Sequence, residues 1–127
     1  MIIDRVRNKE EFKTFFNAHP MNDGILSYDF LVNSPLLFCC YDDITDDLKG
    51  YISIYTGDTD KLFLCGAGIR HNMPDNIRAI IKVCEAFNDD IYADTDIKEA
   101  KICLLKAGFK KIENNLYVRF KNGKKQK

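Results

Sequence analysis

The sequence predicts an α/β (α+β) domain built on a mixed, mostly antiparallel sheet of six or seven strands, with helices on both faces. Three observations support this class. The 127 residues, 46% hydrophobic and 30% charged, can bury one core but not two. Three consecutive apolar segments are joined by turns, which is typical of antiparallel strands. Two segments with a single apolar helical face then flank a short strand near residues 90–94.

The N-terminal part predicts a strand followed by a helix. Residues 2–6 alternate between apolar and polar side chains, and Asn8 offers an N-cap for a helix that begins at Lys9. Its apolar face combines Phe12, Phe15, Phe16 and His19. His19 is expected at the helix end, as a C-terminal cap or a surface residue. Residues 21–35 are expected to hold a short helix and a loop.

The middle of the chain predicts three antiparallel strands. Residues 36–41 and 48–56 are apolar and flank an acidic turn at residues 42–47, which indicates a hairpin. A second turn at residues 57–60 returns the chain into residues 61–69. The apolar side chains of this last segment suit a central strand.

Two helices and three short strands complete the prediction. Pro74 and Asp75 open a helix whose inward face is Ile77, Ile80, Ile81, Cys84 and Phe87. After a strand at residues 90–94, Thr95 or Asp96 caps a second helix that Gly108 ends, with Ile97, Ala100, Cys103, Leu104 and Ala107 facing inward. A hairpin of residues 110–112 and 116–120 closes a domain spanning residues 1–120, and the basic tail of residues 121–127 is expected to be disordered.

Composition narrows the classes of function. Nineteen basic and nineteen acidic residues cancel, so net charge gives no reason to expect nucleic acid or an anionic membrane as a partner. The sequence has no apolar run long enough for a membrane span and its first residues lack a secretory signal, which predicts a cytoplasmic protein. The five cysteines lack metal-ligand spacing and are expected to be thiols that pack as small hydrophobic side chains: Cys39, Cys40, Cys65, Cys84 and Cys103. We therefore expect no metal site.

The predicted order of elements, together with the segment ending Lys106-Ala107-Gly108-Phe109, resembles the GNAT superfamily of N-acetyltransferases over nearly the whole chain. The family pattern is a helix with an alanine eight residues before its glycine, then a hairpin carrying an aromatic residue and an arginine. This sequence matches the pattern at Ala100, Lys106, Gly108, Phe109, Tyr117 and Arg119. Within the superfamily, it is similar to short, divergent GNAT-like proteins encoded by bacteriophages.

The resemblance implies acetyl-CoA as the cofactor, held in a V-shaped gap where the fourth and fifth strands splay apart. The gap would lie between residues 64–69 and 90–94. The implied cofactor-binding residues are Cys65, Gly66, Ala67, Gly68, Ile69, Arg70, His71, Asn72 and Asn76. Two explanations of Gly66 and Gly68 stay open: they let a ligand backbone come close, or they form a β-bulge that bends the strand.

The sequence departs from the family at two functional positions. The expected glycine-rich phosphate turn is replaced by residues 70–76, where Pro74 removes a donor and Asp75 is either a repulsive charge or an ordinary helix cap. The tyrosine that protonates the leaving thiolate in many members is replaced by Leu104. Three alternatives stay open: Cys103, Tyr92 or water takes the place of that acid, the step is unassisted, or there is no reaction. The base is equally open among Asp58, Asp60 and Glu85.

Two functions follow from these expectations. The first is an N-acetyltransferase that moves an acyl group directly from the thioester of acetyl-CoA to an amine. The second is a GNAT-shaped interaction or structural protein without catalysis, such as a virion component or a binder of a host factor. The degenerate phosphate turn and Leu104 argue for the second. Both functions stay open, because fold alone does not fix function.

Overall fold

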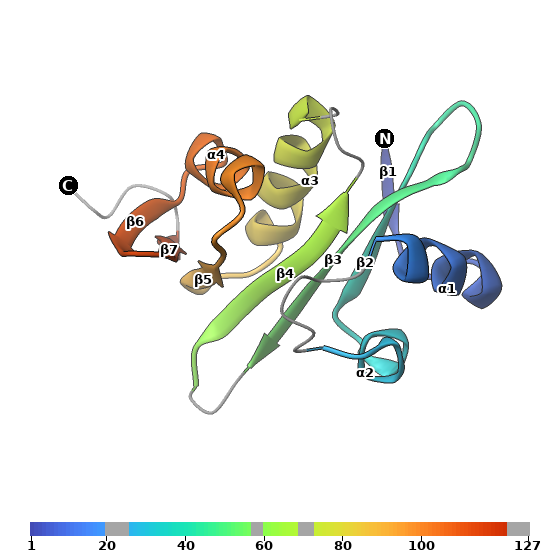
Figure 1. The fold of residues 1–127 in the computed structure, drawn as a ribbon, viewed down its shortest axis with the longest axis horizontal. Helices are drawn as coiled ribbons and strands as arrows, with labels where there is room; N and C mark the ends of the chain where they lie inside the picture. Colours follow the sequence, from blue (N-terminus) through green and yellow to red (C-terminus); the bar gives the residue numbers. More distant parts are fainter. Residues whose placement is uncertain (20–25, 57–59, 69–72, 122–127) are drawn as a thin grey trace.

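A computed structural model describes residues 1–19, 26–56, 60–68 and 73–121 (Figure 1). Seven strands form one sheet in the order β1-β2-β3-β4-β5-β7-β6. The strands are β1 (Ile2–Asp4), β2 (Leu37–Tyr41), β3 (Leu48–Thr56), β4 (Leu62–Gly68), β5 (Ile91–Asp94), β6 (Lys110–Glu113) and β7 (Leu116–Arg119). The helices are α1 (Lys9–Ala18), α2 (Tyr28–Asn33), α3 (Met73–Glu85) and α4 (Lys98–Lys106).

The sheet is mostly antiparallel, as predicted. Within the described residues β4 and β5 pair in parallel, and the other five neighbouring pairs are antiparallel. The parallel pair is possible because α3 forms the crossover between its two strands. The predicted class, with helices on both faces, is confirmed.

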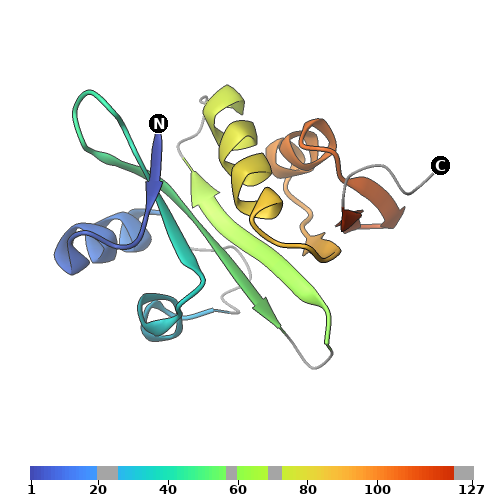
Figure 2. The same ribbon diagram turned by 180° about the vertical axis from the view of Figure 1, so that it is seen from behind.

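The two faces of the sheet carry separate core clusters. One face, here called the α1/α2 face, packs Phe12, Phe15 and Leu31 against Tyr41 and Tyr51. On the opposite α3/α4 face, Ala79 and Val83 of α3 and Leu104 of α4 pack against apolar side chains of β3, β5 and β7, including Ile54, Ile91 and Tyr117. Figures 1 and 2 show α1 and α2 beside β1 to β3, and α3 and α4 beside β4 and β5. Successive residues of a strand point to opposite faces, so β2, β3 and β4 each contribute side chains to both clusters.

The N-terminal helix follows its sequence signals. The side chain of Asn8 accepts a hydrogen bond from the backbone N–H of Glu11, and α1 begins at Lys9. His19 is the C-cap residue, and its ring stacks on Phe15 with centroids 4.3 Å apart. Both predictions are confirmed, whereas β1 ends at Asp4, two residues before the predicted end.

The later helices differ from prediction in detail. In α4 the N-cap is Ile97, not Thr95 or Asp96, because the Thr95 hydroxyl accepts the backbone N–H of Ile97 and forms a turn ahead of the helix. Gly108 ends this helix as predicted, with a φ of +100° that only glycine adopts without strain. The predicted inward face of α3 is confirmed, because Cys84 is buried and Ile77, Ile80, Ile81 and Phe87 pack against the same core; Ala79 and Val83, which were not predicted, are buried as well.

None of the described helices has the length and apolarity needed to cross a bilayer.

Candidate functional site

The parallel strands β4 and β5 touch only at their beginnings. Leu62 pairs with Ile91 and Phe63 pairs with Tyr92, but β4 continues to Gly68 without a further partner residue in β5. On its other side β4 pairs with β3 along its whole length, from Leu62 to Gly68. Figure 1 shows β4 running on past β5 toward the start of α3. The two strands therefore diverge after Phe63, as the predicted V-shaped gap requires.

The backbone of the neighbouring strand β3 leaves no space for a side chain at Gly66. A Cβ on Gly66 would lie 2.2 Å from the backbone oxygen of Tyr51, closer than any real contact. The register between β3 and β4 is unbroken, so the β-bulge expected as one alternative is wrong. The glycine lets two backbones approach, and those backbones belong to β3 and β4.

Gly68 is matched to the first turn of α3. A Cβ on Gly68 would lie 2.5 Å from Oδ1 of Asn76, so the Asn76 side chain fills the space that a larger residue would need. Two of the predicted cofactor-binding residues are thus packed against each other. Ile69, Arg70, His71 and Asn72, predicted between them, lie outside the described residues.

The negative charge of Asp75 at the start of α3 is paired with a positive one. The helix begins at Met73, so Asp75 lies within the first turn and is not the cap residue. Its carboxylate forms an ion pair with Arg78, one turn farther along. An acidic side chain in a first turn stabilises the helix dipole, and Arg78 offsets the repulsion it would exert on an anion.

Cys65 and Ala67 point from β4 to the α1/α2 face and pack against its core. Cys65 is opposite Ser53 of β3. Ser53 is fully buried, and its hydroxyl has no hydrogen-bond partner within the described part of the chain. Cys65 itself is partly exposed, whereas the other four cysteines are buried. All five are free thiols, as predicted.

Leu104, where the family resemblance implied a tyrosine, lies in the core. Leu104 is 3% exposed and packs among the α3/α4 core residues. The neighbouring Cys103 is also buried, and burial, with a smaller effect from Glu99, raises the pKa of its thiol. A thiol with a raised pKa is a poorer proton donor.

Tyr92, the other predicted acid, lies away from Cys103. Its neighbours Ile91 and Ala93 belong to the α3/α4 core, so the alternation of the strand directs Tyr92 to the α1/α2 face. There its ring centroid is 5.8 Å from that of Phe63, and the Lys61 ammonium lies 5.6 Å from the Tyr92 centroid. The structure therefore does not bring Cys103 and Tyr92 together.

A shallow hollow of about 240 Å³ adjoins Tyr92 at the beginning of β4 and β5. It is lined by Asp60, Lys61, Leu62, Asp89, Asp90 and Tyr92. Asp60, a candidate base, is exposed there, and Glu85 is exposed at the end of α3. Asp58 lies outside the described residues. The described residues contain no cluster of histidine, cysteine and carboxylate groups that could hold a metal ion.

Sequence reasoning missed a row of rings across three strands. Tyr55 pairs with Phe63, and Phe63 pairs with Tyr92. The first pairing was readable, because residues 55 and 63 are equidistant from the centre of the turn that joins β3 and β4. The second depends on the parallel register of β5, which no short-range sequence signal reveals.

Comparison with known proteins supports the fold. No family model and no curated protein matches the sequence. Among solved structures, the chain is similar to an acetyltransferase of the GNAT family from Streptococcus pneumoniae, with a TM-score of 0.57 and 14% identity. The match covers 92% of this chain and 95% of that one. The chain thus has a GNAT-like fold, and its activity has to be inferred from the site.

Proposed function

We propose that this protein is an acetyl-CoA-dependent N-acetyltransferase. The observation that carries the proposal is the divergence of β4 from β5 after Phe63 in a GNAT-like fold. Acetyl-CoA supplies an acyl group on a thioester: the amine nitrogen bonds to the carbonyl carbon, the carbon–sulfur bond breaks, the thiolate leaves and the nitrogen loses its proton to solvent.

The edge of β4 beyond Phe63 fits an extended ligand. Each strand residue offers one N–H and one C=O, and alternate residues direct these groups to the same side. Residues 64–68 are partly exposed, and Gly66 is exposed. An extended amide chain can add to such an edge as another strand would. Pantetheine, with its two amides, suits this edge.

The phosphates of the cofactor would depend on side-chain charge. We assign Arg70 and His71 to the attraction of the phosphates, because Pro74 and Asp75 stand where a backbone cradle would otherwise hold them. Asn76 follows at the start of the adjoining helix. Screened, exposed charge contacts contribute about 1 kcal/mol or less each, so acetyl-CoA should bind weakly and less tightly at high salt.

Turnover should be slow because the thiolate leaves without a well-placed acid. Leu104 has no proton to donate, the Cys103 thiol is buried with a raised pKa, and Tyr92 lies on the opposite face of the sheet. Water is then the proton donor. General acid catalysis typically contributes about 10²–10⁴-fold, so its loss slows an enzyme without abolishing its reaction.

A non-catalytic interaction protein is the second candidate. It is favoured by the burial of Leu104 in the core, which leaves no room at that position for the family's tyrosine. In that case the divergence of the strands is an inherited feature of the fold that binds no cofactor. In both cases the five free thiols agree with a reducing compartment, and we place the protein in the cytoplasm.

Calorimetric titration with acetyl-CoA separates the two candidates. We compare the affinities of the wild type, Arg70→Ala and Asp75→Gly at low and high salt. Arg5→Ala is the matched control, because it removes an exposed arginine far from the proposed site. An acetyltransferase should show weak, salt-dependent binding that Arg70→Ala reduces and Arg5→Ala does not. No heat in any variant at millimolar ligand would support the interaction protein.

A further inference from the structure

The rings of Tyr55, Phe63 and Tyr92 form a continuous row on the α1/α2 face, here called the aromatic ladder. Tyr55 and Phe63 have centroids 5.9 Å apart at 31°, and Phe63 and Tyr92 have centroids 5.8 Å apart at 37°. All three are partly exposed. In the described part of the chain, Phe63 and Tyr92 pack into neither core cluster.

The aromatic ladder ends where the strands diverge. Phe63 and Tyr92 are the last paired residues of β4 and β5. Whatever rests on their rings is therefore within a residue or two of the gap in which the proposed thioester carbon would lie. This inference rests on the proposed function, and it concerns the acceptor.

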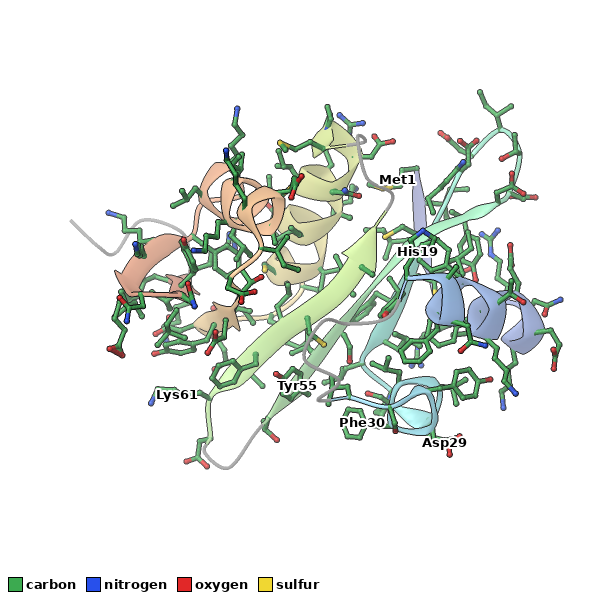
Figure 3. The ribbon with its side chains drawn as sticks, viewed as in Figure 1. Met1, His19, Asp29, Phe30, Tyr55 and Lys61 are labelled. Atoms are coloured by element: carbon green, nitrogen blue, oxygen red, sulfur yellow. The ribbon has the colours of Figure 1, made fainter. Side chains whose placement is uncertain are left out.

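The surroundings of the aromatic ladder favour a cation. The Lys61 ammonium lies 5.6 Å from the Tyr92 centroid, a distance at which ring faces attract positive charge. The adjoining hollow is lined by three acidic residues, Asp60, Asp89 and Asp90, of which Asp90 accepts a hydrogen bond from the backbone N–H of Lys121. Figure 3 shows Lys61 and Tyr55 at the same end of the sheet. Ring faces and carboxylates both attract cations, and Lys61 is the one cationic residue among those that line the hollow.

We propose that the aromatic ladder binds an ammonium group of the acceptor, and that the acceptor is a small aliphatic diamine. The amine that attacks the thioester must be unprotonated, so its nitrogen cannot be the cation held by the rings. A second, charged nitrogen is needed for recognition. A strand rises about 3.3 Å per residue, so a spacer of about four or five carbon atoms joins the rings to the gap.

Binding is tested without catalysis by using pentyltrimethylammonium, a cation that cannot be acetylated. Its affinity for the protein is measured by NMR titration of the ring signals. Loss of one ring in Phe63→Leu or Tyr92→Leu should weaken binding by about two- to fivefold. Tyr28→Leu is the matched control, because Lys13 lies 5.8 Å from the Tyr28 centroid in an equivalent cation–ring contact outside the aromatic ladder.

Removal of the Lys61 charge should have the opposite effect on cation binding. Its ammonium occupies the face of Tyr92, so Lys61→Met should expose the ring and strengthen pentyltrimethylammonium binding by about two- to fivefold. Lys13→Met removes the matching charge from Tyr28 and should leave binding unchanged. Equal affinities in all of these variants, each shown by its melting curve to be folded, would overturn the inference.

Turnover separates this inference from the proposed function. Acetylation of 1,5-diaminopentane is compared with acetylation of 5-amino-1-pentanol, which has the same length and lacks the second cation. Both the acetyltransferase and the diamine are supported if the KM is lower for the diamine than for the amino alcohol, and if Phe63→Leu raises the KM of the diamine alone. Equal use of both amines retains the acetyltransferase and overturns the diamine. Cation binding without acetylation of either retains the aromatic ladder as a cation site and removes the acetyltransferase.

Discussion

The side chain of Asn76 lies against Gly68 so closely that it fills the position of a Cβ at residue 68. A Cβ there would be 2.5 Å from Oδ1 of Asn76 and 2.9 Å from its Cγ. The contact joins the end of β4 to the first turn of α3, on the two sides of the segment at residues 69–72. It fixes where α3 begins relative to the strand edge on which the proposed cofactor site depends.

Alanine substitutions at Gly66 and Gly68 should differ in cost. At Gly66 the new Cβ meets the backbone of β3, which cannot rotate away, and the free energy of unfolding should fall by about 1–3 kcal/mol. At Gly68 it meets the end of the Asn76 side chain, which can turn aside, so the loss should be below about 1 kcal/mol. Urea unfolding of both variants measures the difference. Equal losses would contradict the assigned contacts.

Leu104→Tyr should not restore an acid. Leu104 is 3% exposed, so a larger side chain with a hydroxyl overpacks the α3/α4 core and should cost about 1–3 kcal/mol of unfolding free energy. Leu105→Tyr, next along α4 and 52% exposed, is the matched control and should change stability by less than about 0.5 kcal/mol. Thermal melting measures both. A stable Leu104→Tyr with increased acetyl transfer would show that this helix face is open to the cofactor.

Cys65 should be the thiol that reacts in the native protein. Burial raises the pKa of Cys39 to about 12 and those of Cys40 and Cys84 to about 11, so these three thiols stay protonated as well as buried. Iodoacetamide at about pH 8, where the thiolate is the nucleophile, should label one site, found by mass spectrometry. Cys65→Ser should abolish the labelling. Rapid labelling of a second cysteine would contradict the described packing.

The β2–β3 turn should contribute an acid-sensitive part of the stability. The carboxylate of Asp42 accepts hydrogen bonds from the backbone N–H groups of Thr45 and Ile44, which hold its pKa below the usual 3.8. A lowered folded-state pKa stabilises the fold above the unfolded-state pKa, and this stability is lost as the pH falls through the folded-state value.

The corresponding comparison is Asp42→Ala against wild type. Their difference in unfolding free energy should be largest at about pH 6 and shrink below about pH 4. Asp47→Ala, the loss of another carboxylate in the same turn, controls for net charge. A difference between Asp42→Ala and wild type that persists unchanged into acid would mean that the carboxylate charge plays no part in the turn.

Most of the fold could be predicted from the sequence, because the local sequence signals and the pattern of buried side chains indicate the same elements. The apolar run of β3 matches its observed bounds, Leu48–Thr56, and Asn8 and Gly108 bound their helices as their chemistry dictates. Prediction failed where a side chain had two uses. Thr95 has the chemistry of a cap, but its hydroxyl serves the N–H of Ile97 in a turn before α4.

The candidate site was less readable, because it depends on contacts between distant segments. The sequence suggested a use for Gly66 and Gly68 but not that Tyr51 and Asn76 fill the space beside them. The aromatic ladder requires the register of Tyr92 against Phe63, across a crossover of more than twenty residues. Predicted phosphate contacts at Arg70 and His71 stay predictions.

Backbone NMR tests whether the edge of β4 beyond Phe63 receives acetyl-CoA. Amide shifts of the labelled protein are followed during titration with acetyl-CoA to millimolar concentration. We predict that the largest changes fall in residues 64–68 of β4 and at the start of α3, with β1 and the β6–β7 hairpin unaffected. No change at saturating ligand, or changes centred away from β4, would contradict it.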